Sequence, residues 1–384
     1  MTDVYDAIVI GGGIVGASSA YHLSRAGVKT LLLDREDDGR ATDAGAGILS
    51  PATSSRTASD DWFAFATDAV GYYDDLLECL ARDGVESTGY DRTGLLAVAV
   101  SETEVDRYEA TLERIEARTS RLGAPKPGSV EEVEPATARD RFPPLGDVER
   151  AFYYEDAARV DGRAFAGALC EAGRAHGLTV ELGDVESIER EHEAVTGIRT
   201  VSGRFIETGR VIVAGGAWSR SFADDLGIAL PIEPQRGQLV HLEWPGSRTD
   251  DWPLISGFGD HYVVPWPGGR VVVGATRESG SGFDVRATAG GVQEVLEEAL
   301  SVAPGLEAAT FRAVRVGVRP TTPDGLPILG AVPGADGAYL ATGHGPTGLQ
   351  LGPYSATLVA ELAMGESVGD ALEPFTVERF GRRR

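Results

Sequence analysis

The chain has 384 residues, and its 35 lysines and arginines against 59 aspartates and glutamates give a formal net charge of −24. At about 150 residues per domain, this length predicts two domains or one large interleaved body, and a hydrophobic content of 42% is typical of a globular protein. The acidity disfavours binding to nucleic acid, and no apolar run reaches the roughly 18 to 20 residues of a membrane-spanning helix.

The first 35 residues contain the sharpest pattern in the chain. Residues 6–10 are largely apolar and predict a short buried strand, which leads directly into Gly11, Gly13 and Gly16 in the spacing G-x-G-x-x-G. A helix with an apolar stripe is expected next, with Gly27 at its end. The glycines permit a tight turn, a close approach of backbone N–H groups to a pyrophosphate, and close packing of the helix on the strand. The pattern therefore predicts a dinucleotide-binding site.

Asp34 narrows the choice of dinucleotide. It ends a second predicted strand at 29–33 and lies 23 residues after Gly11, where a carboxylate accepts hydrogen bonds from ribose hydroxyls. The same carboxylate repels a 2′-phosphate, so the pattern disfavours NADP and leaves FAD or NAD.

The remaining elements are predicted from periodicity and turn residues. After a loop of small residues at 39–51, helices are expected around 60–83 and 103–119, on either side of a strand at 94–100. The stretch 122–148 holds five prolines and is interpreted as a surface connection. Further predictions are a helix at 162–175, strands at 178–182, 210–214, 236–244, 260–266, 269–277, 311–318 and 337–342, and helices at 290–303 and 349–364.

This order of elements predicts an α/β fold with two interleaved domains. Nucleotide-binding pieces are expected at 1–50, 150–218 and 319–384, and together they form one discontinuous, Rossmann-like domain. The β-rich insertions 51–149 and 219–318 are expected to form a smaller α+β substrate domain on a mixed, mostly antiparallel sheet.

Cysteine and histidine usage excludes some kinds of site. With only Cys79 and Cys170 the chain has no disulfide framework, and its six histidines are scattered without metal-ligand spacing, so no metal site is expected. The acidic N-terminus lacks the basic segment of a secretory signal, which predicts a cytoplasmic protein.

The basic residues indicate a habitat. Lysine occurs only at positions 29 and 126, and every other basic residue is arginine. Strong acidity with almost no lysine favours a halophilic protein, whose charged surface stays hydrated in a salt-rich cytoplasm. The alternative, a GC-rich genome, explains the scarcity of lysine but not the net charge.

Several spaced motifs resemble the D-amino-acid oxidase family of flavoproteins, the group of glycine oxidase, D-amino-acid dehydrogenase and sarcosine oxidase. The resemblance covers essentially the whole chain. Its motifs are 11–16 with Asp34, 44–51, 213–219, 234–238, 273–276, 317–320 with 323–327, and 343–348.

The resemblance implies non-covalently bound FAD, extended across the Rossmann-like domain. Its ADP part is expected on Gly11–Gly16 and Asp34, its middle near Ala44–Ile48 and Val185, and its flavin ring near Gly47, Gly215, Arg319 and residues 344–350. The expected FAD-binding residues are Gly11, Gly13, Ile14, Val15, Gly16, Asp34, Arg35, Ala44, Gly45, Ala46, Gly47, Ile48, Val185, Gly215, Trp218, His344, Gly345, Thr347, Gly348, Leu349 and Gln350.

The resemblance also implies the chemistry, which is hydride transfer from the α-carbon of a small amino acid to flavin N5. The substrate would be glycine, a D-amino acid or an N-methyl amino acid, and the resulting imine would hydrolyse. Arg319 is predicted to bind the substrate carboxylate with its guanidinium fork, and Tyr262 to assist. The alternative for Arg319 is an ion pair at a strand end, and for Tyr262 a half-buried strand aromatic. His344 is expected to have a structural role on the cofactor side.

Three hypotheses about function stay open at this point. The first is an FAD enzyme that passes electrons to oxygen, a quinone or another protein. The second is an NAD-linked dehydrogenase, which a single G-x-G-x-x-G does not exclude. The third is a non-catalytic flavin-binding protein that has kept the fold. The sequence leaves the oligomeric state undetermined.

Overall fold

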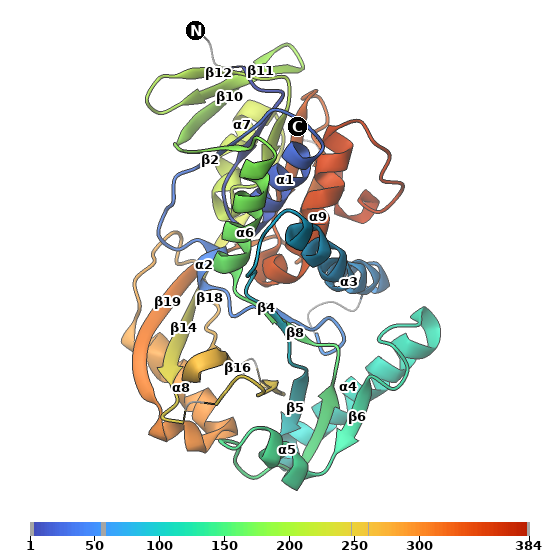
Figure 1. The fold of residues 1–384 in the computed structure, drawn as a ribbon, viewed down its shortest axis with the longest axis vertical. Helices are drawn as coiled ribbons and strands as arrows, with labels where there is room; N and C mark the ends of the chain where they lie inside the picture. Colours follow the sequence, from blue (N-terminus) through green and yellow to red (C-terminus); the bar gives the residue numbers. More distant parts are fainter. Residues whose placement is uncertain (1–3, 55–58, 247, 260, 382–384) are drawn as a thin grey trace.

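The computed structural model describes residues 4–54, 59–246, 248–259 and 261–381. It has the predicted α/β fold, and the chain passes repeatedly between an upper and a lower part, each built on a sheet (Figure 1). The upper part contains a six-stranded sheet in the order β20-β21-β13-β1-β2-β9, in which β20 alone runs antiparallel. Its strands are β1 (Ala7–Ile10), β2 (Thr30–Asp34), β9 (Thr179–Leu182), β13 (Val211–Val213), β20 (Ile328–Ala331) and β21 (Ala338–Thr342).

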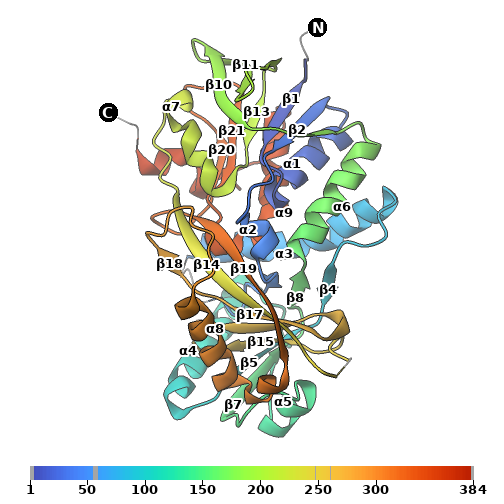
Figure 2. The same cartoon turned by 90° about the vertical axis from the view of Figure 1, so that its left-hand side faces the viewer.

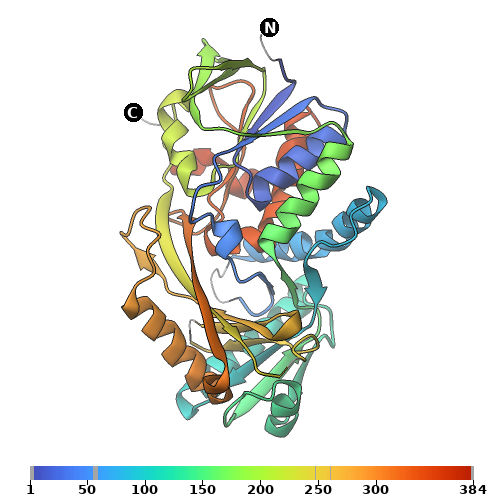
Figure 3. The same ribbon diagram turned by 60° about the vertical axis from the view of Figure 1, so that its left-hand side comes forward.

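Both faces of this sheet are covered, as a parallel sheet requires. Successive residues of β1 point to opposite faces: Ala7 and Val9 join the core under the helices, and Ile8 and Ile10 join the core on the other side. On the helical face α1 packs between α6 and α9 (Figure 3). The helices of this face are α1 (Ile14–Arg25), α3 (Asp60–Arg82), α6 (Gly162–Ala175) and α9 (Gly348–Ala363).

A three-stranded antiparallel sheet covers the other face, and the sequence did not predict it. It consists of β10 (Val185–Glu191), β11 (Ala194–Thr200) and β12 (Phe205–Glu207), with the short α7 (Ala223–Leu226) nearby. Its inward residues, such as Ile188 and Ile198, complete the second core. Charged residues in β10 and Gly197 in β11 interrupt the apolar alternation, so the periodicity gave no prediction there.

The lower part is built on a mixed, mostly antiparallel sheet, as predicted. Its order is β18-β14-β17-β16-β15-β5-β7-β6, β19 lies along the other edge of β14, and only β15 and β5 pair in parallel. Figure 2 shows β14 and β19 as two long strands that connect the upper and lower parts. The strands are β5 (Leu95–Ala99), β6 (Val130–Val133), β7 (Arg150–Tyr154), β14 (Glu233–Glu243), β15 (Leu254–Gly257), β16 (Tyr262–Pro265), β17 (Arg270–Gly274), β18 (Glu278–Ser279) and β19 (Thr310–Thr321).

The remaining elements are short or lie on the outside of this sheet. The helices are α2 (Ala41–Ala44), α4 (Glu102–Leu122), α5 (Pro135–Arg141) and α8 (Ala289–Val302), and β3 (Ile48–Leu49), β8 (Ala158–Val160) and β4 (Tyr90–Arg92) form a small sheet. The prediction of a bare surface connection over 122–148 was wrong, because that stretch contains α5 and the edge strand β6. The strand expected at 260–266 is described from residue 262; residue 260 lies outside the described residues.

The sequence assigned 51–149 and 219–318 to the substrate domain and the rest of the chain to the FAD-binding domain. Three elements of the structure make contacts between these two predicted domains. Helix α3 packs on α9, with the rings of Phe65 and Tyr354 5.2 Å apart. Strand β7 pairs with β5 of the large sheet, and β19 pairs with β14 through residue 321. The two-domain division itself stays a prediction. Among the described helices, none is both long enough and apolar enough to cross a membrane.

Candidate active site

A cavity of about 560 Å³ lies where the carboxyl ends of β1, β2, β13 and β21 meet the large sheet. Ligands of open α/β sheets bind at this position. We call the lining from the β1–α1 turn, the end of β2 and the residues after β13 the glycine end. We call the lining from the large sheet, which includes Arg277 and Arg319, the arginine end.

The β1–α1 turn at the glycine end is formed by backbone in close contact. Gly11 has a φ of +104°, and a Cβ there would lie 2.6 Å from the carbonyl oxygen of Ala214. A Cβ on Gly16 would lie 1.7 Å from the carbonyl oxygen of Gly11, so only glycine lets α1 approach β1 this closely. Gly13 caps α1 without a side-chain hydrogen bond, and the first turn has no acidic residue. The positive end of α1 is therefore available to an anion.

Asp34, at the end of β2, is connected to this turn. Its Oδ2 accepts hydrogen bonds from the backbone N–H of Gly12 at 2.5 Å and from Nη1 of Arg40 at 3.1 Å. Its Oδ1 accepts from the N–H of Glu36 at 2.7 Å. Hydrogen bonds from the β1–α1 turn and from two residues that follow β2 thus fix the carboxylate beside the cavity.

The segment around Gly47 also lines the cavity. Gly47 has a φ of +86°, and a Cβ would lie 2.0 Å from the carbonyl oxygen of Val160. Gly45 is similarly close to Leu349, where a Cβ would lie 2.7 Å from Cδ1. Gly47 is required, because a side chain there would collide with backbone, whereas a side chain at Gly45 would have to displace the end of the Leu349 side chain.

The N-terminus of α9 points backbone N–H groups at the cavity. Thr347 precedes the helix without capping it, and the first turn carries no acid. His344 is buried and contacts Ser355 through Nε2 at 2.8 Å. Burial lowers the pKa of His344 to about 4, so it is neutral at pH 7. Gln350 accepts from the N–H of Ser50 at 3.0 Å, but its buried Nε2 has no hydrogen-bond partner among the described residues.

At the arginine end, Arg319 lies on β19 over a glycine of the neighbouring strand. A Cβ on Gly237 would lie 2.4 Å from Nη2 of Arg319, so the strand leaves room for the guanidinium. Nη1 of Arg319 donates to the carbonyl oxygen of Thr276 at 2.8 Å, and no described carboxylate lies within ion-pair distance of Arg319. Burial lowers the pKa of Arg319 and the charge of Arg277 lowers it further, whereas Tyr262 and the carboxylate of Glu278 raise it.

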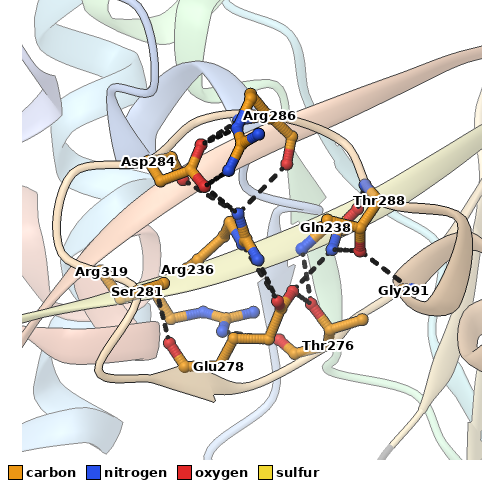
Figure 4. A network of polar contacts seen from close by, with 10 residues as sticks. All are labelled: Arg236, Gln238, Thr276, Glu278, Ser281, Asp284, Arg286, Thr288, Gly291 and Arg319. Atoms are coloured by element: carbon orange, nitrogen blue, oxygen red, sulfur yellow. Dashed lines mark hydrogen bonds and ion pairs between the residues drawn. The ribbon is translucent and has the colours of Figure 1, made fainter.

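A network of buried polar side chains holds Thr276 in place (Figure 4). Oε2 of Glu278 accepts from Nη2 of Arg236 at 2.5 Å, and Oε1 accepts from Nε2 of Gln238 at 2.6 Å and from Oγ1 of Thr276 at 2.7 Å. Thr276 Oγ1 in turn accepts from the N–H of Gln238 at 2.9 Å. Burial tends to raise the pKa of Glu278, but these hydrogen bonds outweigh it and the pKa lies below its usual value. The carboxylate is therefore charged at pH 7.

Comparison with known proteins identifies the family. Residues 6–362 match the family described as FAD dependent oxidoreductase, DAO. The chain belongs to this family. It is 39% identical to the oxidoreductase YurR of Bacillus subtilis over 96% of this chain and 97% of that one. It is 30% identical to the glycine oxidase of Geobacillus kaustophilus over 99% of this chain and 98% of that one. The crystal structure of iminodiacetate oxidase from Chelativorans sp. BNC1 superposes with a TM-score of 0.91 at 37% identity, over 96% of this chain and 98% of that one.

The protein is thus an FAD-dependent oxidoreductase of the DAO family, and its cavity fits that cofactor. The starts of α1 and α9 face the same cavity, and neither first turn carries an acidic residue that would repel a pyrophosphate. The absence of a side chain at Gly11 lets the β1–α1 turn lie against Ala214, where a Cβ would collide. The unpartnered Nε2 of Gln350 supplies a hydrogen-bond donor for a bound group. The family membership excludes the NAD-linked alternative.

Nearly all of the predicted site residues lie together. Arg319, Tyr262 and the expected FAD-binding residues line this one cavity, with the exception of Gly16, which lies behind the turn and lets α1 pack on β1. The polar contact of His344 with Ser355 fits the expected structural role. That these residues contact FAD and substrate stays a prediction.

Several residues that line the cavity were not predicted from the sequence. Arg40, Thr42 and Arg277 line the cavity but fall outside any motif with an assigned role. Thr42 accepts from the N–H of Ile14 at 3.0 Å, and Gly237 makes room for Arg319. The register of β14 against β19 brings Gly237 opposite Gly317, and no local pattern reveals such a long-range pairing.

Proposed function

We propose that the protein oxidises the amine of a small amino acid: glycine, a D-amino acid or an N-substituted glycine. The observation that carries the proposal is the position of Arg319. Its guanidinium faces the cavity that the dinucleotide-binding turn also lines. It donates to a backbone carbonyl, and no described carboxylate lies within ion-pair distance of it. An amino-acid carboxylate is the natural partner for such a fork.

The names of the relatives support this substrate class. Glycine and iminodiacetate, after which two of the relatives are named, both carry an amine on the carbon next to a carboxylate. The relatives thus share the feature that Arg319 is proposed to recognise.

The roles of this chain's own residues follow from their positions. When bound, FAD supplies the acceptor for the hydride that leaves the α-carbon. Arg319 would hold the carboxylate, and Tyr262 would help to fix it. Thr276 is hydrogen-bonded to Glu278 and accepts from the guanidinium of Arg319, so the guanidinium would keep one orientation while substrates exchange. His344 is neutral and bonded to Ser355, so we assign it no proton transfer. The imine product would hydrolyse in water to an oxo acid and an amine.

Binding of FAD is proposed to be non-covalent. A covalent link to cysteine needs a thiol at the cavity, and neither Cys79 nor Cys170 is among the described residues that line it. Denaturation in acid should release all of the yellow colour into the supernatant, and colour that stays with the precipitated protein would contradict the proposal.

The experiment that tests the proposed function is a substrate panel with two acceptors. FAD-loaded protein is incubated with glycine, sarcosine, D-alanine and L-alanine, first with oxygen and then with an artificial electron acceptor. We expect an oxo acid from at least one of the first three substrates, and the comparison of acceptors shows whether the enzyme is an oxidase. Absence of any oxo acid with both acceptors would overturn the proposal.

We also propose that the enzyme works at high salt. Its formal net charge of −24 means that negative surface groups repel one another in dilute buffer. Added salt screens this repulsion, because the screening length falls from about 10 Å at 0.1 M to about 3 Å at 1 M. We expect circular dichroism to show a melting temperature that rises steadily from 0.1 M to 3 M KCl. An unchanged melting temperature would contradict the proposal.

A further inference from the structure

Arg277 lies at the arginine end of the cavity together with Arg319, and the proposed function does not yet use it. It belongs to the segment that connects β17 to β18 and is exposed, whereas Arg319 is only partly exposed. Arg277 therefore lies on the open side of the cavity and Arg319 deeper inside.

Both neighbours of Arg277 are held by the network shown in Figure 4. Thr276 and Glu278 bond to each other through their side chains at 2.7 Å, and Glu278 is anchored to Arg236 on β14. The backbone of residue 277 is thus fixed at both sides. Because Nη1 of Arg319 donates to the carbonyl oxygen of Thr276, one short segment positions both arginines of the arginine end.

The two guanidinium groups act on each other electrostatically. The positive charge of Arg277 contributes to lowering the pKa of Arg319. The carboxylate of Glu278, behind the lining, opposes this effect on Arg319. A bound group with two carboxylates could place one beside each guanidinium, which a single carboxylate does not do.

We propose that Arg277 binds a second carboxylate of the substrate, so that the enzyme prefers dicarboxylic amino acids. This inference rests on the proposed function, in which Arg319 binds the carboxylate next to the reacting carbon. Arg277 adds a contact at the open side of the cavity and determines specificity without touching the carbon that is oxidised. The second carboxylate is carried either on the nitrogen substituent or on the side chain.

The first test compares catalytic efficiencies at one fixed salt concentration. Iminodiacetate carries its second carboxylate on the nitrogen substituent, aspartate carries it on the side chain, and sarcosine and alanine are the matching monocarboxylates. We expect kcat/KM for one of the two dicarboxylates to exceed that for its monocarboxylate by about 10-fold. Arg277→Gln should remove most of this ratio, and Arg277→Lys should keep part of it because the charge remains.

A matched control removes a positive charge elsewhere on the same sheet. Arg312 lies on β19, is exposed, pairs with Glu243 and does not line the cavity. Arg312→Gln changes the net charge of the protein as Arg277→Gln does, and it should leave the substrate ratio as in the wild type.

The second test measures binding without turnover. Thiodiglycolate and methylthioacetate replace the amine by sulfur, so they report on carboxylate recognition alone through their perturbation of the flavin spectrum. The wild type should bind the dicarboxylate about 10-fold more tightly, and Arg277→Gln should abolish the difference. Binding of these analogues can be measured even if the enzyme oxidises no amine in the panel. A failure of the proposed function is therefore distinguishable from a failure of this inference.

Two results would overturn the inference. One is a wild-type enzyme that oxidises sarcosine or alanine but neither prefers a dicarboxylate nor binds thiodiglycolate more tightly. The other is a preference that Arg277→Gln leaves intact or that Arg312→Gln removes equally.

Discussion

The two ends of the cavity are built differently. In and behind the β1–α1 turn of the glycine end, backbone atoms of Gly11 and Gly16 lie so close to their neighbours that a Cβ does not fit. At the arginine end Arg319 lies over Gly237, and the ion pair of Glu278 with Arg236 lies behind this lining. The first end is thus sensitive to added volume, and the second to changed charge. The difference fits the proposed division of the cavity, in which close-packed backbone binds the large cofactor and charged side chains bind the small substrate.

Gly16→Ala should have the largest effect, because it adds volume where the backbone is closest. Its Cβ would overlap the carbonyl oxygen of Gly11 at 1.7 Å, and separating α1 from β1 should cost more than about 3 kcal/mol. We expect the purified variant to lack the flavin absorbance band near 450 nm. Gly167→Ala is the control, because this exposed position in α6 has no atom within 4 Å of the added Cβ. A variant at Gly16 that loads FAD like the wild type would break the comparison.

Arg319→Lys should have the next largest effect, and it should spare the cofactor. Lysine keeps the charge but loses the guanidinium fork, so we expect kcat/KM for glycine or sarcosine to fall about 100-fold. The ratio of flavin to protein absorbance should stay as in the wild type, because the glycine end is unchanged. Unaltered kinetics would show that the substrate carboxylate binds elsewhere.

Glu278→Gln sharpens the comparison, since it changes charge at nearly constant volume. The substitution leaves the buried Arg236 with a weaker partner and loosens Thr276, which holds Arg319. We expect KM to rise about 10-fold with a smaller change in kcat, and the free energy of unfolding to fall by about 2 kcal/mol.

The dependence of stability on pH, measured together with KM for Glu278→Gln, distinguishes a role in positioning Arg319 from a role in stability alone. The pKa of Glu278 is lowered in the folded protein, so its stabilisation is complete above its usual value of 4.5 and decreases as the pH falls through the folded value. The variant should lose this part of the acid dependence, whereas Glu243→Gln, at the exposed end of β14, should keep it and should not raise KM. A variant at Glu278 with wild-type KM would remove its positioning role.

His344→Gln should have the smallest effect. It should change how the free energy of unfolding varies between pH 7 and 5. Burial lowers the pKa of His344 from 6.5 to about 4, so its contribution to stability is complete above pH 6.5 and decreases as the pH falls from 6.5 toward 4. We expect the loss of stability from pH 7 to 5, measured by urea unfolding, to be smaller in the variant by about 1 to 2 kcal/mol. The exposed His192→Asn is the control and should retain the wild-type slope.

The glycine end was predictable because its determinants are local. Gly11, Gly16 and Asp34 fall within one strand–helix–strand unit, and each is required by backbone geometry that a spacing pattern expresses. Arg319 and Tyr262 were found only through the family resemblance. Their placement at one cavity depends on strands β16 and β19, which lie some 50 residues apart in the sequence and belong to one large sheet.

The network behind Arg319 was not predictable from the sequence. Arg236 and Glu278 are 42 residues apart and meet because β14 and β18 pair in antiparallel register. The sheet of β10–β12 was not predicted for another reason: charged residues in β10 and Gly197 in β11 interrupt the alternation on which the prediction relies.

Anaerobic titration of the flavin band near 450 nm tests the central claim most directly. The FAD-loaded protein is mixed without oxygen with amino acids and with the corresponding amines that lack the carboxylate, such as sarcosine against dimethylamine. We predict that the amino acid bleaches the band and the amine does not, and that Arg319→Lys slows bleaching about 100-fold. Equal bleaching by both compounds, or none by any amino acid of the panel, would contradict the account.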